Sequence, residues 1–309
     1  MIEEAKGVVK RVEELKKGGR GSRFPHWLTC HPCFNPQAHF QFSRMHLPVA
    51  PKCNIQCGYC KRGIDKCEYR PGVACKIMSP EEAAKLVDEA AKKDERLRVV
   101  AIAGPGEPLF NEETFETFRL VNERHPGLIK CIATNGLLLE EKASLLKSLG
   151  VRAVTVTINA LDPEMASKIY EFIILDGRVI KGIEASRILI ERQLKGLKAA
   201  ADQGLVVKVN TVLIPGLNEG EVVEVAKKVA ELGAFMQNVI PLIPLHSFKD
   251  HRPPTCEELK KVREEASKYI QQFRLCEQCR ADSYGIPGFE RRGEPKDQEP
   301  YLAFHALTP

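Results

Sequence analysis

The sequence lacks any hydrophobic run long enough to cross a bilayer, although 43% of its 309 residues are hydrophobic. A membrane-spanning helix needs about 20 consecutive apolar residues. The charged, amphipathic segment 1–17 contains no apolar core of the kind found in a secretory signal peptide. We therefore expect a soluble cytoplasmic protein without a membrane partner, built as one large α/β domain with appendages.

A dense block of basic residues is also missing. The net charge is +5, and the charged residues, 28% of the total, are spread along the chain. This mild excess weakly favours an anionic ligand and does not support a nucleic-acid partner.

Cysteine, by contrast, is abundant, with eleven residues in the chain. Disulfides are rare in reducing compartments, where we expect a chain without an export signal to be found. Cysteines there more often bind metal. Iron–sulfur ligation is therefore the default expectation.

Three of the cysteines, Cys53, Cys57 and Cys60, are spaced three and then two residues apart. Three thiolates can hold three irons of a [4Fe–4S] cluster, which leaves the fourth iron open for chemistry. The alternative is a structural zinc site, which needs four ligands and would have to recruit Cys67 or Cys75.

This cysteine loop, with Tyr59 just before its last cysteine, resembles that of radical S-adenosylmethionine (SAM) enzymes. The resemblance implies that SAM chelates the open iron and receives one electron, which releases a 5′-deoxyadenosyl radical. The protein then supplies binding and orientation.

Apolar segments alternate with amphipathic helical segments along the chain. Such alternation predicts a parallel sheet covered by helices and does not by itself distinguish a barrel from a Rossmann sheet. The resemblance to radical SAM enzymes implies a partial (βα)6 barrel. The expected strands are 44–51, 97–103, 128–134, 153–158, 205–213 and 235–242, and the expected helices are 2–17, 79–93, 112–123, 140–148, 184–202, 219–232 and 255–273. Ser79 and Glu82 form a predicted capping box at the start of the second of these helices.

In barrels the chemistry lies at the carboxyl ends of the strands. A glycine segment, Gly104-Pro105-Gly106-Glu107-Pro108, follows the second strand. It resembles the Gly-Gly-Glu-Pro motif with which radical SAM enzymes bind the amino group of SAM, although Pro105 departs from that motif. The expected cofactor-binding residues are Gly104, Gly106, Glu107, Thr134, Asn135, Asn159 and Asn210.

Further metal-capable side chains flank the predicted barrel. The segment 24–42, which reads as irregular structure, carries His26, Cys30, His31, Cys33 and His39. Another pair, Cys276 and Cys279, follows the last helix. A lone Cys-x-x-Cys suits zinc or redox work equally well, but beside an N-terminal loop of this kind it indicates a second cluster.

The likeness becomes more specific in a set of segments that resemble the NifB family of nitrogenase cofactor maturases. They include His31-Pro32-Cys33-Phe34, Phe42 to His46, Val49-Ala50-Pro51, Arg70 to Val73, and Cys276 to Gly285. The resemblance implies that two further [4Fe–4S] clusters, held as substrate, are fused with a carbide and a sulfide into an 8Fe–9S–C precursor of the nitrogenase cofactor. Carried over by position, His31, Cys33, Cys131, Cys276 and Cys279 are the expected substrate-cluster ligands, without apportionment between the two clusters.

The resemblance also implies partners and a division of the chain. The partners are SAM, iron–sulfur cluster donors, an electron donor such as ferredoxin, and downstream carrier or scaffold proteins. Residues 1–43 are expected to form a helix and a cluster-binding loop, residues 44–250 the partial barrel, and residues 251–309 a helix and a Cys-x-x-Cys tail that closes it. We expect no NifX-like domain.

Two other functions are compatible with these residues. One is a radical SAM maturase of the molybdopterin-synthesis or peptide-modifying type, whose auxiliary cluster binds an organic substrate. The other is a passive iron–sulfur or zinc scaffold. Asp65 and Arg70 are candidates for contact with SAM or for managing a proton, although a solvated loop carboxylate is the simpler reading for Asp65.

Overall fold

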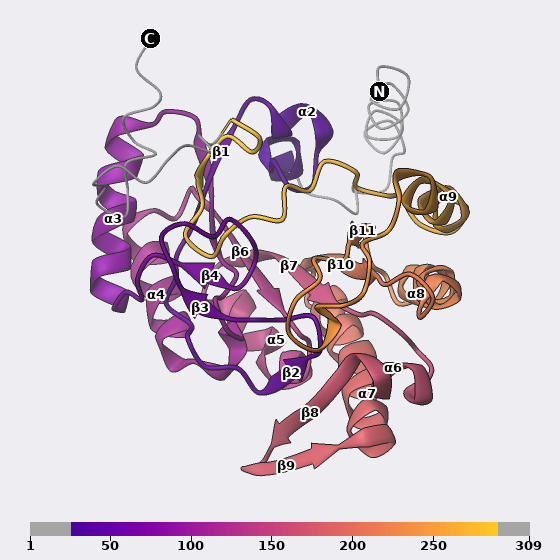
Figure 1. Cartoon of the computed structure of the whole chain (residues 1–309). Coiled ribbons are helices and arrows are strands. Elements are labelled where there is room, and N and C mark those ends of the chain that lie inside the picture. The colour runs from indigo at the N-terminus through magenta and orange to yellow at the C-terminus, as the bar shows by residue number, and fades with distance from the viewer. Residues whose placement is uncertain (1–25, 290–309) are drawn as a thin grey trace.

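The computed structural model describes residues 26–289, so the predicted helix 2–17 lies outside the described part. Six parallel strands form a curled sheet, and a helix follows each of them (Figure 1). This confirms the partial (βα)6 barrel. The strands are β1 (Ser43–His46), β5 (Leu97–Ile102), β6 (Ile129–Thr134), β7 (Val151–Thr157), β10 (Val206–Leu213) and β11 (Met236–Pro241).

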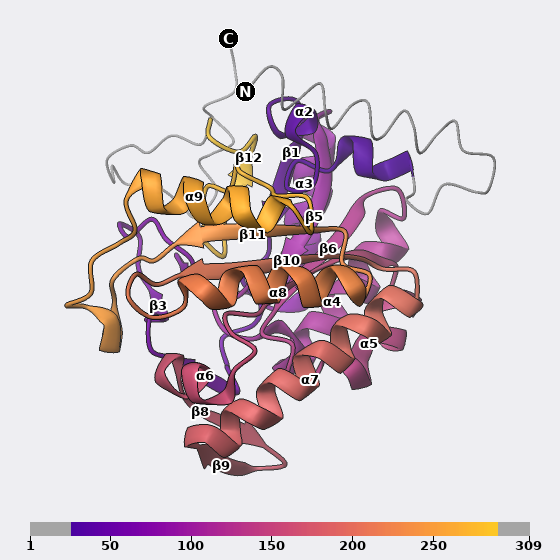
Figure 2. The same cartoon turned by 90° about the vertical axis from the view of Figure 1, so that its right-hand side faces the viewer.

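The strands keep their chain order across the sheet, and the helices cover its outer face. The helices are α3 (Pro80–Lys93), α4 (Glu112–Arg124), α5 (Leu139–Ser148), α7 (Gly182–Asp202), α8 (Glu219–Glu231) and α9 (Cys256–Ser267). Neighbouring helices pack against one another, and α8 and α9 lie outside strands β10 and β11 (Figure 2). The main core, which includes Phe118, Ile132 and Val154, fills the space between helices and sheet.

The expected helix boundaries hold with one exception. The capping box of α3 is present, because the Ser79 hydroxyl accepts from the Glu82 amide and the Glu82 carboxylate accepts from the Ser79 amide. Helix α9 ends at Ser267, six residues before the expected 273. The residues beyond it extend along β11 instead, where the Gln237 amide donates to the Gln271 carbonyl and the Phe273 amide to the Gln237 carbonyl, both at 2.8 Å.

A hairpin and a short helix interrupt the fourth βα unit, and neither was expected. Helix α6 (Pro163–Ile169) leads into β8 (Tyr170–Leu175) and β9 (Arg178–Lys181), joined by Asp176 and Gly177, which both have positive φ. An Asp-Gly pair between apolar segments is a strong hairpin signal, so the sequence does contain it. Strand β2 (Ile55–Cys57), part of the cysteine loop, pairs with β8.

The carboxyl-terminal tail crosses the open side of the half-barrel. It runs beside β11 at residues 271–273 and reaches the opposite edge of the sheet, where β12 (Tyr284–Gly285) pairs antiparallel with β1. On the way it contacts a small sheet of β3 (Gly63–Ile64) and β4 (Val73–Ala74), since the Ala281 amide donates to the Val73 carbonyl at 2.9 Å. The tail therefore connects both edges of the sheet and closes the inner face.

The remaining elements are short. The segment 26–42, expected to be irregular, contains a 3₁₀ turn η1 (His26–Cys30) and a helical turn α2 (Pro36–His39), which Asn35 caps and Pro36 opens. The other 3₁₀ turns are η2 (Pro108–Phe110) and η3 (His246–Phe248). No helix within residues 26–289 is both long and apolar enough to cross a membrane.

Candidate active site

A cavity of about 330 Å³ lies inside the half-barrel, against the inner face of the sheet. The strands present small side chains to it, among them Ala101, Ala133 and Thr155, and this is why the interior is not filled. All eight of the expected metal ligands line this one cavity: His31, Cys33, Cys53, Cys57, Cys60, Cys131, Cys276 and Cys279.

Local hydrogen bonds fold the three-cysteine loop. The Gln56 amide group donates to the carbonyls of Cys57 and Cys60, each at 2.9 Å. Gly58 packs so closely on Phe248 that a Cβ would lie 2.5 Å from the ring. The loop is therefore held from both sides, and its three thiols all face the cavity.

The three thiols of this loop have raised pKa values. Burial raises the pKa of Cys53 to about 11 and that of Cys57 well above its usual value, and the charge of neighbouring cysteines raises the pKa of Cys57 further. The thiols are thus neutral without metal, and binding must displace their protons. Among residues 26–289, no three His, Cys, Asp or Glu side chains converge on a single ion.

The glycine segment lies directly against the start of the cysteine loop. The Gly106 amide donates to the Ala50 carbonyl at 2.7 Å, and the Glu107 amide to the Lys52 carbonyl at 2.8 Å. A Cβ on Gly106 would be 2.2 Å from the Lys52 carbonyl oxygen, so only glycine fits there. Gly106 and Glu107 line the cavity; Gly104, with a φ of +128°, does not.

The Glu107 side chain joins the carboxyl ends of two strands. Its carboxylate accepts from the Thr134 hydroxyl at 2.5 Å, the Asn135 amide at 2.7 Å and the Leu109 amide at 3.0 Å. Burial nevertheless raises its pKa to about 7, outweighing these three donors. Asn135 in turn donates to the Asn54 side chain at 2.7 Å, which ties this network to the cysteine loop.

The two other predicted cofactor contacts occupy different environments. Asn210 lines the cavity, and its side-chain oxygen accepts from Asn238 at 3.0 Å. Asn159 is fully buried behind the wall, where it donates to the hydroxyls of Tyr59 at 2.8 Å and Tyr170 at 3.0 Å. The structure therefore places Asn159 where it orients the aromatic ring of the cysteine loop.

His31 and Cys33 are the two residues that the amino-terminal segment contributes to the cavity, together with Cys131 from β6. His26, Cys30 and His39 lie outside its wall. The His31 Nδ1 atom accepts from the Cys33 amide at 3.2 Å, while Nε2 is buried without a hydrogen-bond partner among the described residues. Burial, together with the charge of Lys208, lowers the pKa of His31. A neutral imidazole can offer a lone pair to iron, and its tautomer changes with what it binds.

Arg44 holds the tail cysteine Cys279, and Arg280 holds the tail itself. Arg44, fully buried, donates to the Cys279 sulfur at 3.0 Å and to the Gly285 carbonyl at 2.7 Å. Arg280 pairs with Asp282 at 2.8 Å and also donates to the carbonyls of Asp65 and Glu68. What distinguishes these arginines is that their large cationic side chains are buried. Burial is visible only in the structure, so the sequence patterns assigned them no role.

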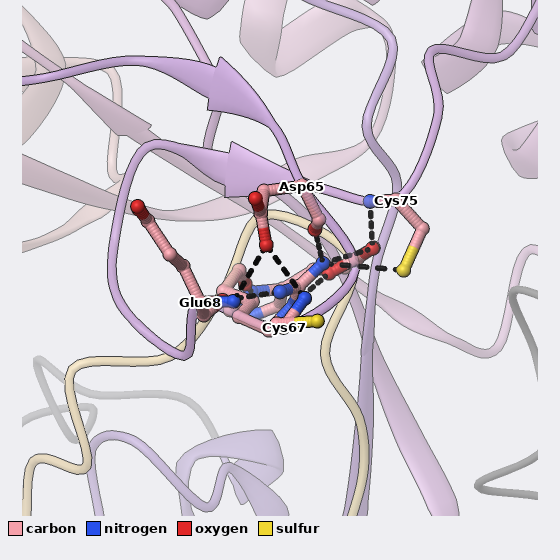
Figure 3. Close-up of polar contacts among 7 residues, drawn as sticks. Asp65, Cys67, Glu68 and Cys75 are labelled. Carbon is pink, nitrogen blue, oxygen red and sulfur yellow. Dashed lines mark hydrogen bonds and ion pairs between the residues drawn. The ribbon is translucent and has the colours of Figure 1, made fainter. Parts of the chain in front are cut away.

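The loop between the cysteine triad and α3 packs against this tail (Figure 3). Asp65 accepts from the amides of Cys67 at 2.6 Å and Glu68 at 2.8 Å, so its carboxylate stabilises a turn. Arg280 donates to the Cys75 sulfur at 3.2 Å. Cys67 and Cys75 do not line the cavity, whereas Arg70 does.

Comparison with known proteins shows which families have similar sequences. The radical SAM superfamily model matches residues 47–229. FeMo cofactor biosynthesis protein NifB of Methanocaldococcus jannaschii is 51% identical over 267 residues, covering 86% of this chain and 89% of that protein. NifB of Chlorobaculum tepidum is 40% identical over 295 residues, covering 90% and 70%.

Solved structures are similar at the level of the fold. Streptococcus suis SuiB superposes with a TM-score of 0.57 at 15% identity, covering 76% of this chain and 50% of that one. Methylornithine synthase (PylB) gives 0.52 at 15% identity, covering 76% and 72%.

Proposed function

The chain belongs to the NifB family within the radical SAM superfamily, and from that premise we propose that it fuses two [4Fe–4S] clusters, with carbide and sulfide insertion, into an 8Fe–9S–C precursor. It is a radical SAM enzyme of nitrogenase cofactor biosynthesis that uses a [4Fe–4S] cluster and SAM. The observation that supports the proposed reaction is that all eight candidate ligands line one cavity.

Cys53, Cys57 and Cys60 would hold the cluster that binds SAM. The bound group supplies the electron that cleaves SAM. Gly106 and Glu107 would bind the amino group of SAM: Gly106 holds this turn against the Lys52 backbone, and Thr134 and Asn135 fix the buried carboxyl of Glu107. Asn210 lines the same wall, while Asn159 orients Tyr59. Gly104, outside the wall, gives the glycine segment a turn that needs a positive φ.

The five remaining ligands would hold the substrate clusters. His31, Cys33 and Cys131 form one group, since the charge of Cys33 raises the pKa of Cys131 and the Cys33 amide bonds to His31. Cys276 and Cys279 on the tail form the second. Five ligands cannot bind every iron of two clusters. Fewer protein bonds then have to break when the product is released.

The tail that carries Cys276 and Cys279 also supports the proposed division into an amino-terminal loop (1–43), a barrel (44–250) and a closing segment (251–309). Cluster donors, an electron donor such as ferredoxin, and a carrier for the product are the partners that this reaction requires. We propose that the enzyme meets them in the cytoplasm.

The test separates SAM cleavage from cluster fusion. The double variant Cys276→Ala/Cys279→Ala is expected to keep 5′-deoxyadenosine formation and to lose the eight-iron product, whereas Cys256→Ala, which removes an exposed thiol, should change neither. The readouts are chromatography of the nucleoside and transfer of the product to a nitrogenase lacking its cofactor. An unchanged product yield in the double variant would remove the tail from the reaction.

A further inference from the structure

Lys208 is a buried lysine that projects from β10 into the cavity. The residue is 5% exposed, and its ammonium donates to the Cys33 carbonyl at 3.1 Å. The same nitrogen lies 4.8 Å from the ring centre of Phe34 and 5.3 Å from that of Phe273. These contacts fix the ammonium beside the amino-terminal ligand group.

No carboxylate balances this charge within residues 26–289, since no ion pair of Lys208 occurs there. The cavity wall carries five cationic residues against Glu107 as its one acidic residue in the described part of the chain: Arg44, Lys61, Arg62, Arg70 and Lys208. Of these cations, Arg70 is ion-paired with Glu68. A buried cation without an opposite charge is costly, because desolvation is not repaid. A cavity built this way favours an anionic occupant.

The ammonium lies beside residues that are expected to bind the cluster. It donates to the backbone of Cys33, and it lines the same cavity as His31 and Cys131.

We propose that Lys208 is the counter-charge of the substrate cluster held by His31, Cys33 and Cys131, and keeps it in place when thiolates release it. This inference rests on the proposed function. Adding sulfide and carbide makes a cluster core more negative. Anionic thiolates then bind it less well, whereas a fixed ammonium binds it better, so Lys208 is a positioning residue whose contribution grows as the reaction proceeds.

The simplest competing explanation is a lysine that only packs between two aromatic rings. Methionine keeps the length and apolar stem of lysine, and arginine keeps the charge. Lys208→Met should therefore preserve packing and lose the cluster, while Lys208→Arg should keep it. Lys130→Met is the matched control, because Lys130 is a fully buried lysine of β6, in the same sheet, that lies outside the cavity wall.

The experiment uses the full chain, reconstituted anaerobically with iron and sulfide and then passed through a desalting column. The readouts are iron per chain and the EPR signal of reduced clusters that does not shift when SAM is added. Hydrogen bonds to charged groups stabilise enough that Lys208→Met should retain this cluster about 10-fold to 100-fold less well than the parent. Lys208→Arg and Lys130→Met should match the parent.

The proposal would be overturned if Lys208→Met retained the cluster as well as the parent does. It would also be overturned if Lys208→Arg and Lys130→Met lost the cluster as Lys208→Met does. Formation of 5′-deoxyadenosine shows that each variant is folded. Lys208→Gln, which keeps a donor for the Cys33 carbonyl, takes the place of the methionine variant if the latter does not fold, with the same expected loss. A parent protein holding only about four irons would instead refute the proposed function.

Discussion

Replacing Glu107 by Gln should change how the stability of the metal-free protein depends on pH. The carboxyl is buried, and its pKa is raised from the ordinary 4.5 to about 7. One pKa unit corresponds to about 1.36 kcal/mol, so ionising Glu107 costs the folded state about 3 kcal/mol. The neutral Glu107 carboxyl therefore contributes fully to the free energy of unfolding below pH 4.5. Because its pKa is raised, this contribution is lost as the pH rises through 7.

The measurement is urea unfolding of the parent and of Glu107→Gln under anaerobic conditions with a chelator, from pH 4.5 to 8. Relative to the variant, the parent should lose about 3 kcal/mol of stability across this range, because glutamine cannot ionise. Comparing the two proteins cancels the titration of His46, whose pKa burial lowers to about 4. A difference that stays constant with pH would show that the Glu107 carboxyl ionises as freely as in water.

Three further substitutions test other parts of the site. Gly106→Ala should lower the free energy of unfolding by about 1–3 kcal/mol and weaken SAM binding in equilibrium dialysis, since the added Cβ meets a backbone carbonyl. Gly127→Ala is the control: a Cβ there meets nothing, so neither quantity should change. Asn159→Ala should cost about 1–3 kcal/mol in urea unfolding and loosen the Tyr59 ring, with less iron kept by the cysteine loop; unchanged iron retention would count against that positioning role. Arg280→Met should leave the buried Asp282 carboxylate without its ion pair, which lowers the free energy of unfolding by about 3–5 kcal/mol and speeds amide hydrogen exchange in the tail. Exchange at the parent rate would show that Arg280 does not hold the tail.

Sequence patterns predicted the strands and helices because each carries its own periodicity, whereas the partial barrel was implied by the resemblance to radical SAM enzymes. Five of the six strands were expected within a few residues, whereas the first, expected over 44–51, ends at His46. The capping box at Ser79 was identified from its two residues alone. The early end of α9 was not, since the backbone bonds that residues 271–273 make to β11 are tertiary. The β8–β9 hairpin was not predicted despite its Asp-Gly turn, because the expected pattern has one helix between successive strands.

The ligands of the candidate site stay a prediction, and the residues that support them were not predicted. Spacing and resemblance indicated the eight metal-binding residues, and all of them line the cavity. The residues that balance or position them, such as Arg44, Lys208 and Arg280, were not assigned a role, although Arg44 and Arg280 lie within segments that resemble the NifB family. Their importance comes from burial and from contacts between segments far apart in sequence, as between Arg44 and Cys279.

Iron content is the measurement that tests the central claim most directly, because it counts the clusters that one cavity holds. After anaerobic reconstitution the parent should carry about twelve irons per chain, and a variant with Cys53, Cys57 and Cys60 all changed to alanine about eight. The variant should form no 5′-deoxyadenosine. An equal iron count in the two proteins, or about four irons in the parent, would contradict the account.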